Sequence, residues 1–138
     1  MDGSGNAWVA NTGRGAVTEI SSAGLPEPGL NGGGILAPVA VALDGSSNVW
    51  VTDKSANTVV ELSNAGTALS GLSGYTNGVL TGAHCEIAID GSGDAWITNY
   101  GGNSVLELIG VATPVVTPIA AGLPSTPTTG SSKLGTKP

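Results

Sequence analysis

Apolar residues occur along this chain in short runs separated by polar, glycine-rich segments, and this pattern predicts β-strands joined by turns. Two runs, residues 39–43 and 85–89, each lead directly into an Asp-Gly-Ser turn. A strand containing tryptophan follows each turn, and a second turn then leads to a strand with the pattern Val-x-Glu. No stretch of ten residues has apolar side chains at helical spacing. The pattern therefore predicts an all-β protein.

The strands belong to an internal repeat. Residues 1–11, 43–53 and 89–99 align without gaps, at spacings of 42 and then 46 residues. The equivalent residues are Asp2, Asp44 and Asp90 in the turn, Trp8, Trp50 and Trp96 in the next strand, and Glu19, Glu61 and Glu107 in the strand after it. A repeat of this length with four short antiparallel strands is typical of a β-propeller blade.

We therefore expect three four-stranded blades over residues 1–120, at about 1–34, 35–80 and 81–120. The fourth strand of each blade has the weakest pattern. The first blade lacks its inner strand, because Met1 stands where the later copies have Leu43 and Ile89. Residues 121–138 have the composition of a linker and are expected to form a flexible C-terminal tail.

Three blades are too few to close a propeller ring, which normally has at least four. An open arc would leave apolar faces of its two terminal blades in water. We expect a homodimer that closes a six-bladed ring, so that each chain is half of the ring, and consider a nine-bladed homotrimer the less favoured assembly. The alternative is a fragment of a longer propeller, which the missing inner strand supports.

The tandem motif Asp-Gly-Ser-Gly-Asn-x-Trp-Val-x-Asn, followed by Val-x-Glu-Leu, resembles the NHL-type and streptogramin-lyase-like propeller repeats of bacteria. The resemblance covers roughly residues 1–120. It implies a propeller that is commonly six-bladed, in a group that includes lyases and sugar-lactone hydrolases with a metal in the central channel. It also implies an exported bacterial protein. Signatures of the WD repeat are absent from this sequence.

Composition and charge narrow the partners. Of 138 residues, 23 are glycine and only 10% are charged, and the net charge is -6. Because phosphate binding needs clustered Lys and Arg, we expect neither nucleic acid nor an anionic membrane as partner. No apolar run is long enough to span a membrane, and residues 1–3 do not begin a secretory signal. The single cysteine, Cys85, cannot form an intramolecular disulfide.

The two ends of the blades differ in how strictly they repeat. The Asp-Gly-Ser turns at one end hardly change, whereas the loops 11–15, 53–57 and 99–103 at the other end diverge. Binding residues on rigid scaffolds tend to lie in such loops. The candidate ligand-binding residues at this end are Arg14, Lys54 and Tyr100, together with Asp53 and Asn99.

The inner strand of the third blade carries the sharpest break in the repeat. His84, Cys85 and Glu86 stand where the second blade has Pro-Val-Ala, and they include the chain's only histidine and only cysteine. His84 and Glu86, two residues apart on a strand, should project to the same side. Such a pair can hold a divalent metal or act as a base and its orienting partner.

The resemblance supports a metal interpretation of this strand. Metal ligands of the similar lyases and lactone hydrolases are His, Glu, Asn or Asp near the channel mouth, and only His84 and Glu86 match by type and placement. The metal would be Mg²⁺, Ca²⁺ or Zn²⁺. A structural interpretation is also open, with Glu86 a solvated or salt-bridged channel residue and Cys85 a small buried side chain.

Other repeated residues are better explained by structure. The Asp-x-Ser-x-Asn segments begin like Ca²⁺-binding EF-hand loops but lack the required Gly and Glu, so we interpret them as hairpin turns. The repeated tryptophans are expected to pack between blades, and the repeated glutamates to bind backbone or hydroxyl groups. No nucleophile elbow and no phosphate-binding loop occur.

Two functions remain. One is a binding module that presents the loops and the channel mouth to a small molecule or protein. The other is a hydrolase or lyase acting on lactone, ester or phosphoester substrates, with His84, Glu86 and Cys85 as its catalytic residues and a metal or His84 providing the chemistry. A nucleophilic Cys85 is a third, smaller possibility.

Overall fold

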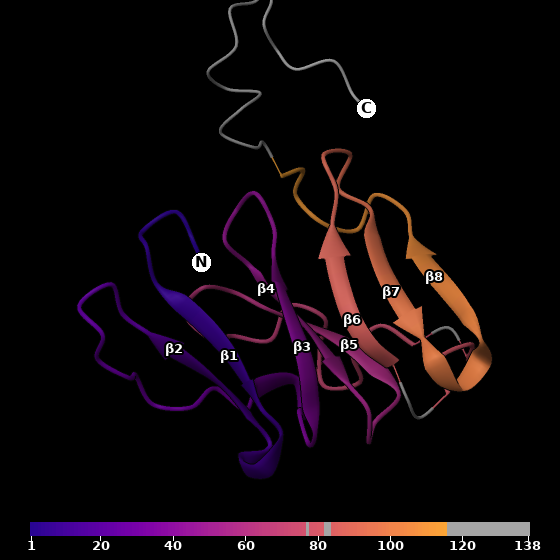
Figure 1. Ribbon diagram of the computed structural model, residues 1–138, viewed down its shortest axis with the longest axis horizontal. Helices are drawn as coiled ribbons and strands as arrows, with labels where there is room; N and C mark the ends of the chain where they lie inside the picture. Colours follow the sequence, from indigo (N-terminus) through magenta and orange to yellow (C-terminus); the bar gives the residue numbers. More distant parts are fainter. Residues whose placement is uncertain (77, 82–83, 116–138) are drawn as a thin grey trace, which may run out of the picture.

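The computed structural model describes residues 1–76, 78–81 and 84–115, with only the backbone described at His84 and Cys85. This part of the chain forms three antiparallel β-sheets and three one-turn 3-10 helices. Figure 1 shows the sheets side by side in sequence order, with β1 and β2 at one end of the row and β8 at the other. Among the described residues no helix is long and apolar enough to cross a membrane.

Each sheet is one blade of the predicted propeller. The strands are β1 (Ala7–Asn11) and β2 (Ala16–Ile20) in the first blade, β3 (Pro38–Leu43), β4 (Val49–Asp53) and β5 (Thr58–Leu62) in the second, and β6 (His84–Ile89), β7 (Ala95–Asn99) and β8 (Ser104–Leu108) in the third. The 3-10 helices are η1 (Thr12–Arg14), η2 (Gly32–Gly34) and η3 (Tyr100–Gly102). Among the described residues, the first blade has no counterpart of the inner strands β3 and β6, as the sequence predicts.

The expected fourth strand is reduced to isolated bridges in the first two blades. Leu30 and Pro26 bridge to β2, and Tyr75 and Ala68 bridge to β5. The expected fourth strand of the third blade begins at residue 114 and runs past the described residues, as does the C-terminal tail. The outer edges of the first two blades are therefore irregular. The innermost described strands of the blades lie beside one another, β1 next to β3 and β3 next to β6.

The hydrophobic core lies between blades. One cluster joins the first blade to the second, and another joins the second to the third. The fully or largely buried members are Trp8, Val17, Ile35, Val49, Val51, Val60 and Leu62 in the first cluster, and Trp50, Val59, Leu80, Ile87, Ala95 and Ile97 in the second. Trp8 and Trp50 thus pack between blades, which confirms the structural interpretation of the repeated tryptophan.

The Asp-Gly-Ser turn is built by its own aspartate. In the second blade the Asp44 carboxylate accepts the backbone N–H groups of Ser46 and Asn48 at 2.9 Å each, and its other oxygen accepts the Trp50 indole N–H at 3.3 Å. The first and third blades repeat this arrangement. The carboxylates therefore close hairpin turns and anchor the tryptophans, as expected from the missing EF-hand residues.

Candidate functional site

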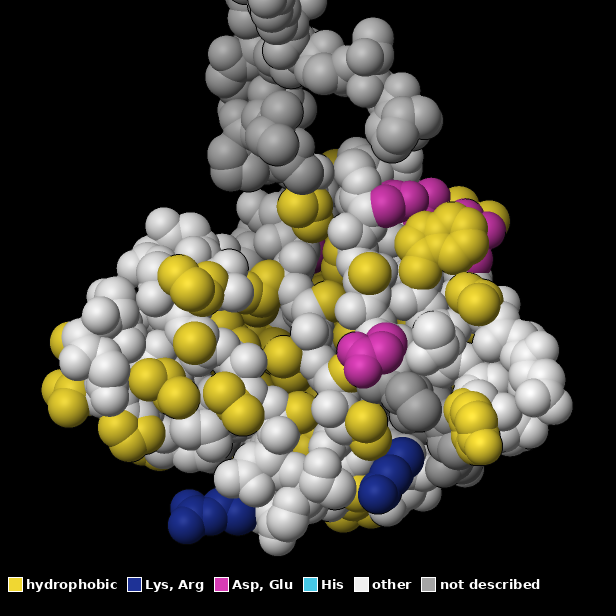
Figure 2. Space-filling view, in the orientation of Figure 1, with side chains coloured by type: hydrophobic (Ala, Val, Ile, Leu, Met, Phe, Trp, Pro, Cys, Tyr) yellow, Lys and Arg dark blue, Asp and Glu magenta, His cyan; other side chains and the backbone are white. Residues whose placement is uncertain are grey.

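The Asp turns and the divergent loops lie at opposite ends of the blades. Both basic residues of the described chain, Arg14 in η1 and Lys54 after β4, are exposed at the loop end, where Figure 2 shows the dark blue side chains along the lower edge. Tyr100, which occupies the position of Lys54 in the third blade, is also exposed. The predicted ligand residues of these three loops therefore share one end of the molecule.

Asp53 lies at the same end but is fully buried at the end of β4. Its carboxylate accepts four backbone N–H groups, from Leu36 at 2.5 Å, Ala37 at 2.8 Å, Ser55 at 2.9 Å and Ala56 at 3.0 Å. Burial opposes the charged form, but these hydrogen bonds outweigh it and hold the pKa of Asp53 below its ordinary value. Asp53 thus fixes both the loop that enters the inner strand and the loop that leaves β4.

Asn99, at the position of Asp53 in the third blade, likewise holds neighbouring segments through hydrogen bonds. Its side-chain oxygen accepts the backbone N–H of Thr81 at 3.2 Å, and its amide donates to the Val79 carbonyl at 3.0 Å and to the Ser104 hydroxyl at 3.1 Å. Asp53 and Asn99 are therefore already hydrogen-bonded within the protein, while Arg14, Lys54 and Tyr100 project into solvent. Of these five residues, a ligand at this end has direct access to Arg14, Lys54 and Tyr100.

The inner strand places His84, Cys85 and Glu86 where the repeat predicts them. His84 pairs with Asn99 just as Pro38 pairs with Asp53, which confirms the alignment of the two inner strands. Glu86 is exposed, and its backbone N–H donates to the Thr98 hydroxyl at 3.0 Å. The side chains of His84 and Cys85 lie outside the described part of the chain.

A β-bulge between His84 and Ile87 interrupts the strand that carries the predicted pair His84 and Glu86. A bulge adds an unpaired residue and interrupts the strict alternation of side chains. The spacing of two residues therefore does not by itself place His84 and Glu86 on one side of the strand. The second blade has the matching irregularity between Pro38 and Ala40, so the bulge belongs to the repeat.

The metal interpretation can be tested against the donors present. Among the described side chains, no three His, Cys, Asp or Glu residues come together as a metal site. Glu86 alone supplies a described donor on this strand, and one carboxylate is fewer than the three or four protein ligands that zinc sites use. The described side chains alone therefore do not make up a metal site, and the His84 side chain, the other predicted ligand, lies outside them.

Sequence reasoning missed the contact between Glu61 and Tyr75. The Tyr75 hydroxyl donates to the Glu61 carboxylate at 2.9 Å, and the Tyr75 ring stacks on Trp50 with ring centroids 5.3 Å apart. Burial, and then the hydrogen bond and charge of Glu61, raise the pKa of Tyr75 to about 12. Burial also raises the pKa of Glu61, against the lowering effect of that hydrogen bond. The sequence predicts that the repeated glutamate binds a backbone or hydroxyl group, but nothing in it identifies Tyr75 as the source of the hydroxyl.

Comparison with known proteins identifies the fold. No family model matches the sequence, and no curated protein matches it. Three solved structures of lyases are similar to this chain. A streptogramin B lyase superposes with a TM-score of 0.61 and 17% identity, over 87% of this chain and 40% of the lyase.

The other two are forms of virginiamycin B lyase from Staphylococcus aureus. A selenomethionine form gives a TM-score of 0.63 and 18% identity over 82% of this chain and 37% of its own. A catalytically inactive histidine-to-alanine variant with Quinupristin gives a TM-score of 0.57 and 15% identity, over 87% of this chain and 41% of its own. This chain spans about 40% of the length of these lyases. It is a partial β-propeller of three blades with the fold of the streptogramin lyases.

Proposed function

We propose that two copies of this chain close a six-bladed ring that binds a small molecule at the loop end of its central channel. The observation that carries the proposal is the exposure of two apolar faces whose equivalents inside the chain are buried. Trp8 and Trp50 are 8% and 0% exposed because the next blade covers them, whereas Trp96 is 40% exposed. The same face of the third blade carries exposed Val105.

The first blade presents the matching surface. Val51 and Ile97, which face the preceding blade, are both 0% exposed, whereas the equivalent Val9 is 44% exposed. Inside the chain, the surface that covers a tryptophan face is always the equivalent of the Val9 face. The partner that fits the Trp96 face is therefore a blade of this repeat type, and a second copy supplies one. The contact is heterologous and must close into a ring to bury every face.

The loop end of that ring supports the binding role. Arg14, Lys54 and Tyr100 are exposed there, and the inner strands, which carry Glu86 in the third blade, lie beside one another toward the channel. The two basic side chains favour a ligand with an anionic group. A homodimer would present two such sets across the channel axis.

The mass in solution tests the assembly. Light scattering at micromolar concentration should give twice the chain mass for the wild type and the single-chain mass for Trp96→Glu. Leu72→Glu, which changes an exposed leucine in an outer loop away from both faces, should keep the double mass. A wild type of single or triple mass would refute the six-bladed dimer.

A second candidate function is a hydrolase or lyase, metal-dependent or His-based. Its support is the fold shared with the streptogramin lyases, one of which is inactive as a histidine-to-alanine variant. Turnover of Quinupristin and of lactone, ester and phosphoester substrates, with metal analysis of the purified protein, separates the two. Under the enzyme hypothesis His84→Ala and Glu86→Ala both lose turnover, while Glu107→Ala retains it. Absence of turnover in the wild type leaves the binding module.

A further inference from the structure

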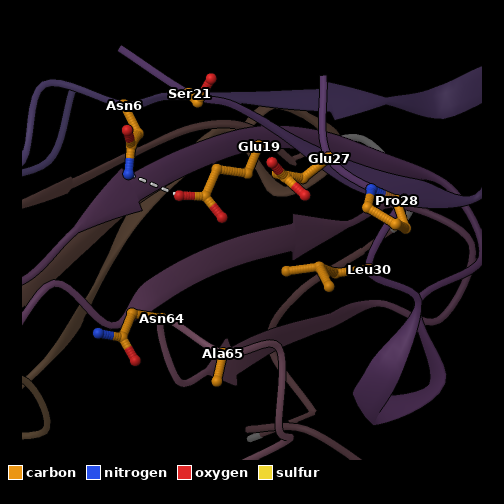
Figure 3. Close-up of a pocket in the computed structure, with 8 residues that line it drawn as sticks. All are labelled: Asn6, Glu19, Ser21, Glu27, Pro28, Leu30, Asn64 and Ala65. Atoms are coloured by element: carbon orange, nitrogen blue, oxygen red, sulfur yellow. Dashed lines mark hydrogen bonds between the residues drawn. The ribbon is translucent and has the colours of Figure 1, made fainter. Parts of the chain in front are cut away.

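A cavity of about 400 Å³ lies between the first and second blades, at the Asp-turn end. This end is opposite to the loops of the proposed ligand site, and the cavity is complete within one chain. Figure 3 shows Asn6 and Glu19 along one wall and Asn64 and Ala65 along the other. Glu27 and Leu30 also line the space. The cavity is therefore independent of ring closure.

Glu19 uses only part of its hydrogen-bonding capacity. One of its carboxylate oxygens accepts the Asn6 amide at 2.7 Å. Within residues 1–76, 78–81 and 84–115, no group donates to its other oxygen or to the Glu27 carboxylate, and no basic side chain pairs with either. Two carboxylates in a cavity wall therefore lack a protein donor among the described residues.

The next junction along the chain shows which protein group donates to the repeated glutamate there. Leu30 bridges to Val17 and Tyr75 bridges to Val59, so Leu30 and Tyr75 occupy equivalent positions. The equivalent of Glu19 is Glu61, which accepts both the Asn48 amide and the Tyr75 hydroxyl. A hydroxyl on an aromatic ring thus acts as a built-in ligand of the repeated glutamate.

Other residues that line the cavity are also more polar or smaller than their equivalents at the second junction. Glu27 and Leu69 each donate the backbone N–H to the carbonyl of the repeated glutamate, so Leu69 replaces Glu27 at the second junction. Asn64 corresponds to Gly110, and Ala65 to Val111, which packs into the second core cluster. The second junction keeps a smaller opening of about 280 Å³ beside Tyr75, and no carboxylate of the described residues lines it. The first junction has the larger opening and carries an added carboxylate and amide.

The chemistry of the walls defines the ligand. Both free acceptors are carboxylates, so the ligand must donate hydrogen bonds, and a positive charge is favoured over a neutral donor. Leu30, Ala65 and Pro28 offer apolar contact to a short hydrocarbon chain. We infer that this interblade cavity binds a small organic ammonium ion, whose N–H groups take the place of the Tyr75 hydroxyl on Glu19 and also reach Glu27.

Binding of 1,4-diaminobutane to the full chain, followed by NMR through the side-chain amides of Asn6 and Asn64, tests this inference. We expect saturable shifts of both amides, and none with 1,4-butanediol, which has the same length without charge. Glu27→Gln should weaken binding at least tenfold, and Leu30→Tyr, which copies the tyrosine of the second junction, should abolish it. Glu107→Gln, at the equivalent exposed glutamate of the third blade, should bind as the wild type does.

Glu27 is exposed, so Glu27→Gln is expected to fold even if Leu30→Tyr does not. Equal shifts with the diol, or unchanged affinity in Glu27→Gln, would overturn the ammonium site. Shifts with CaCl₂ but not with the diamine would overturn it too, in favour of a metal cation. The mass measurement is unaffected by these outcomes, so failure of the ring and failure of this site are distinguishable.

Discussion

Ser47 adopts a backbone conformation that the other two copies of its turn assign to glycine. The equivalent residues Gly5, Ser47 and Gly93 have φ angles of 82°, 62° and 85°. A side chain in this left-handed region costs about 1–2 kcal/mol relative to glycine, and the greater freedom of an unfolded glycine offsets part of that gain. Gly5 and Gly93 therefore serve as internal controls for the strained conformation of Ser47.

We predict that Ser47→Gly raises the free energy of unfolding by up to about 1 kcal/mol, measured by urea denaturation. The reverse change, Gly93→Ser, should destabilise more strongly, because a Cβ there would lie 2.3 Å from the Ala112 carbonyl oxygen. If Ser47→Gly is destabilising, the left-handed strain is not what limits this turn.

Tyr75 gives a second prediction at this scale, on alkaline stability. Its folded pKa of about 12 lies above the ordinary tyrosine value of 10.0, so the stability that Tyr75 contributes is complete below pH 10 and is lost as pH rises through about 12. Ultraviolet titration should show one phenol ionising near pH 12, which disappears in Tyr75→Phe and persists in Tyr100→Phe. A late phenol that persists in Tyr75→Phe would contradict the assignment.

Among the elements, the end of β4 shows how a buried carboxylate organises two loops. Asp53 holds four backbone N–H groups, whereas its neighbour Lys54 is exposed. We predict that Asp53→Ala lowers the free energy of unfolding by about 2–3 kcal/mol, since buried N–H groups lose their acceptor. Lys54→Ala should change it by no more than about 0.5 kcal/mol.

The same carboxylate makes part of the stability depend on acid. Because the folded pKa of Asp53 is lowered, its contribution is present above the unfolded pKa and is lost as pH falls through the folded value. Asp53→Asn should therefore reduce the loss of stability on acidification below about pH 4, measured as the urea midpoint at each pH. An unchanged acid slope would show that Asp53 is not the group responsible.

The strands that the sequence predicts best are those that the repeat fixes. The Val-x-Glu runs become β2, β5 and β8 with the expected residues, and the inner strands begin one residue earlier than expected, at Pro38 and His84. The outer strands could not be predicted as bridges, because their pairing depends on irregular loops. The bulge in the inner strand is likewise invisible to a pattern of period two.

For the whole molecule, the exposure of Trp96 makes assembly visible by fluorescence. We predict that acrylamide quenching of tryptophan falls as the protein is concentrated, because ring closure covers Trp96. Trp96→Phe should remove this concentration dependence, while Trp50→Phe, at a tryptophan that is already buried, should keep it. Quenching that is independent of concentration in a protein of double mass would place the interface elsewhere.

Some candidate sites can be predicted from one repeat alone, whereas others depend on contacts between residues far apart in the sequence. The loops with Arg14 and Lys54 and the substituted inner strand with Glu86 are visible as breaks in the repeat. The interblade cavity is not, because it needs Asn64 of the second blade to face Glu19 of the first. Tertiary packing alone brings such residues together, so no spacing within one repeat predicts them.

The missing inner strand of the first blade has a consequence for hydrogen exchange. β4 and β7 each pair on both sides, whereas β1 pairs only with β2 among the described residues. Alternate amides of β1 therefore point at a position that no described strand occupies, and they should exchange with deuterium far faster than the matching amides of β4. A strand that docked along this edge would slow those amides selectively, and an exchange map would thus show which residues complete the blade.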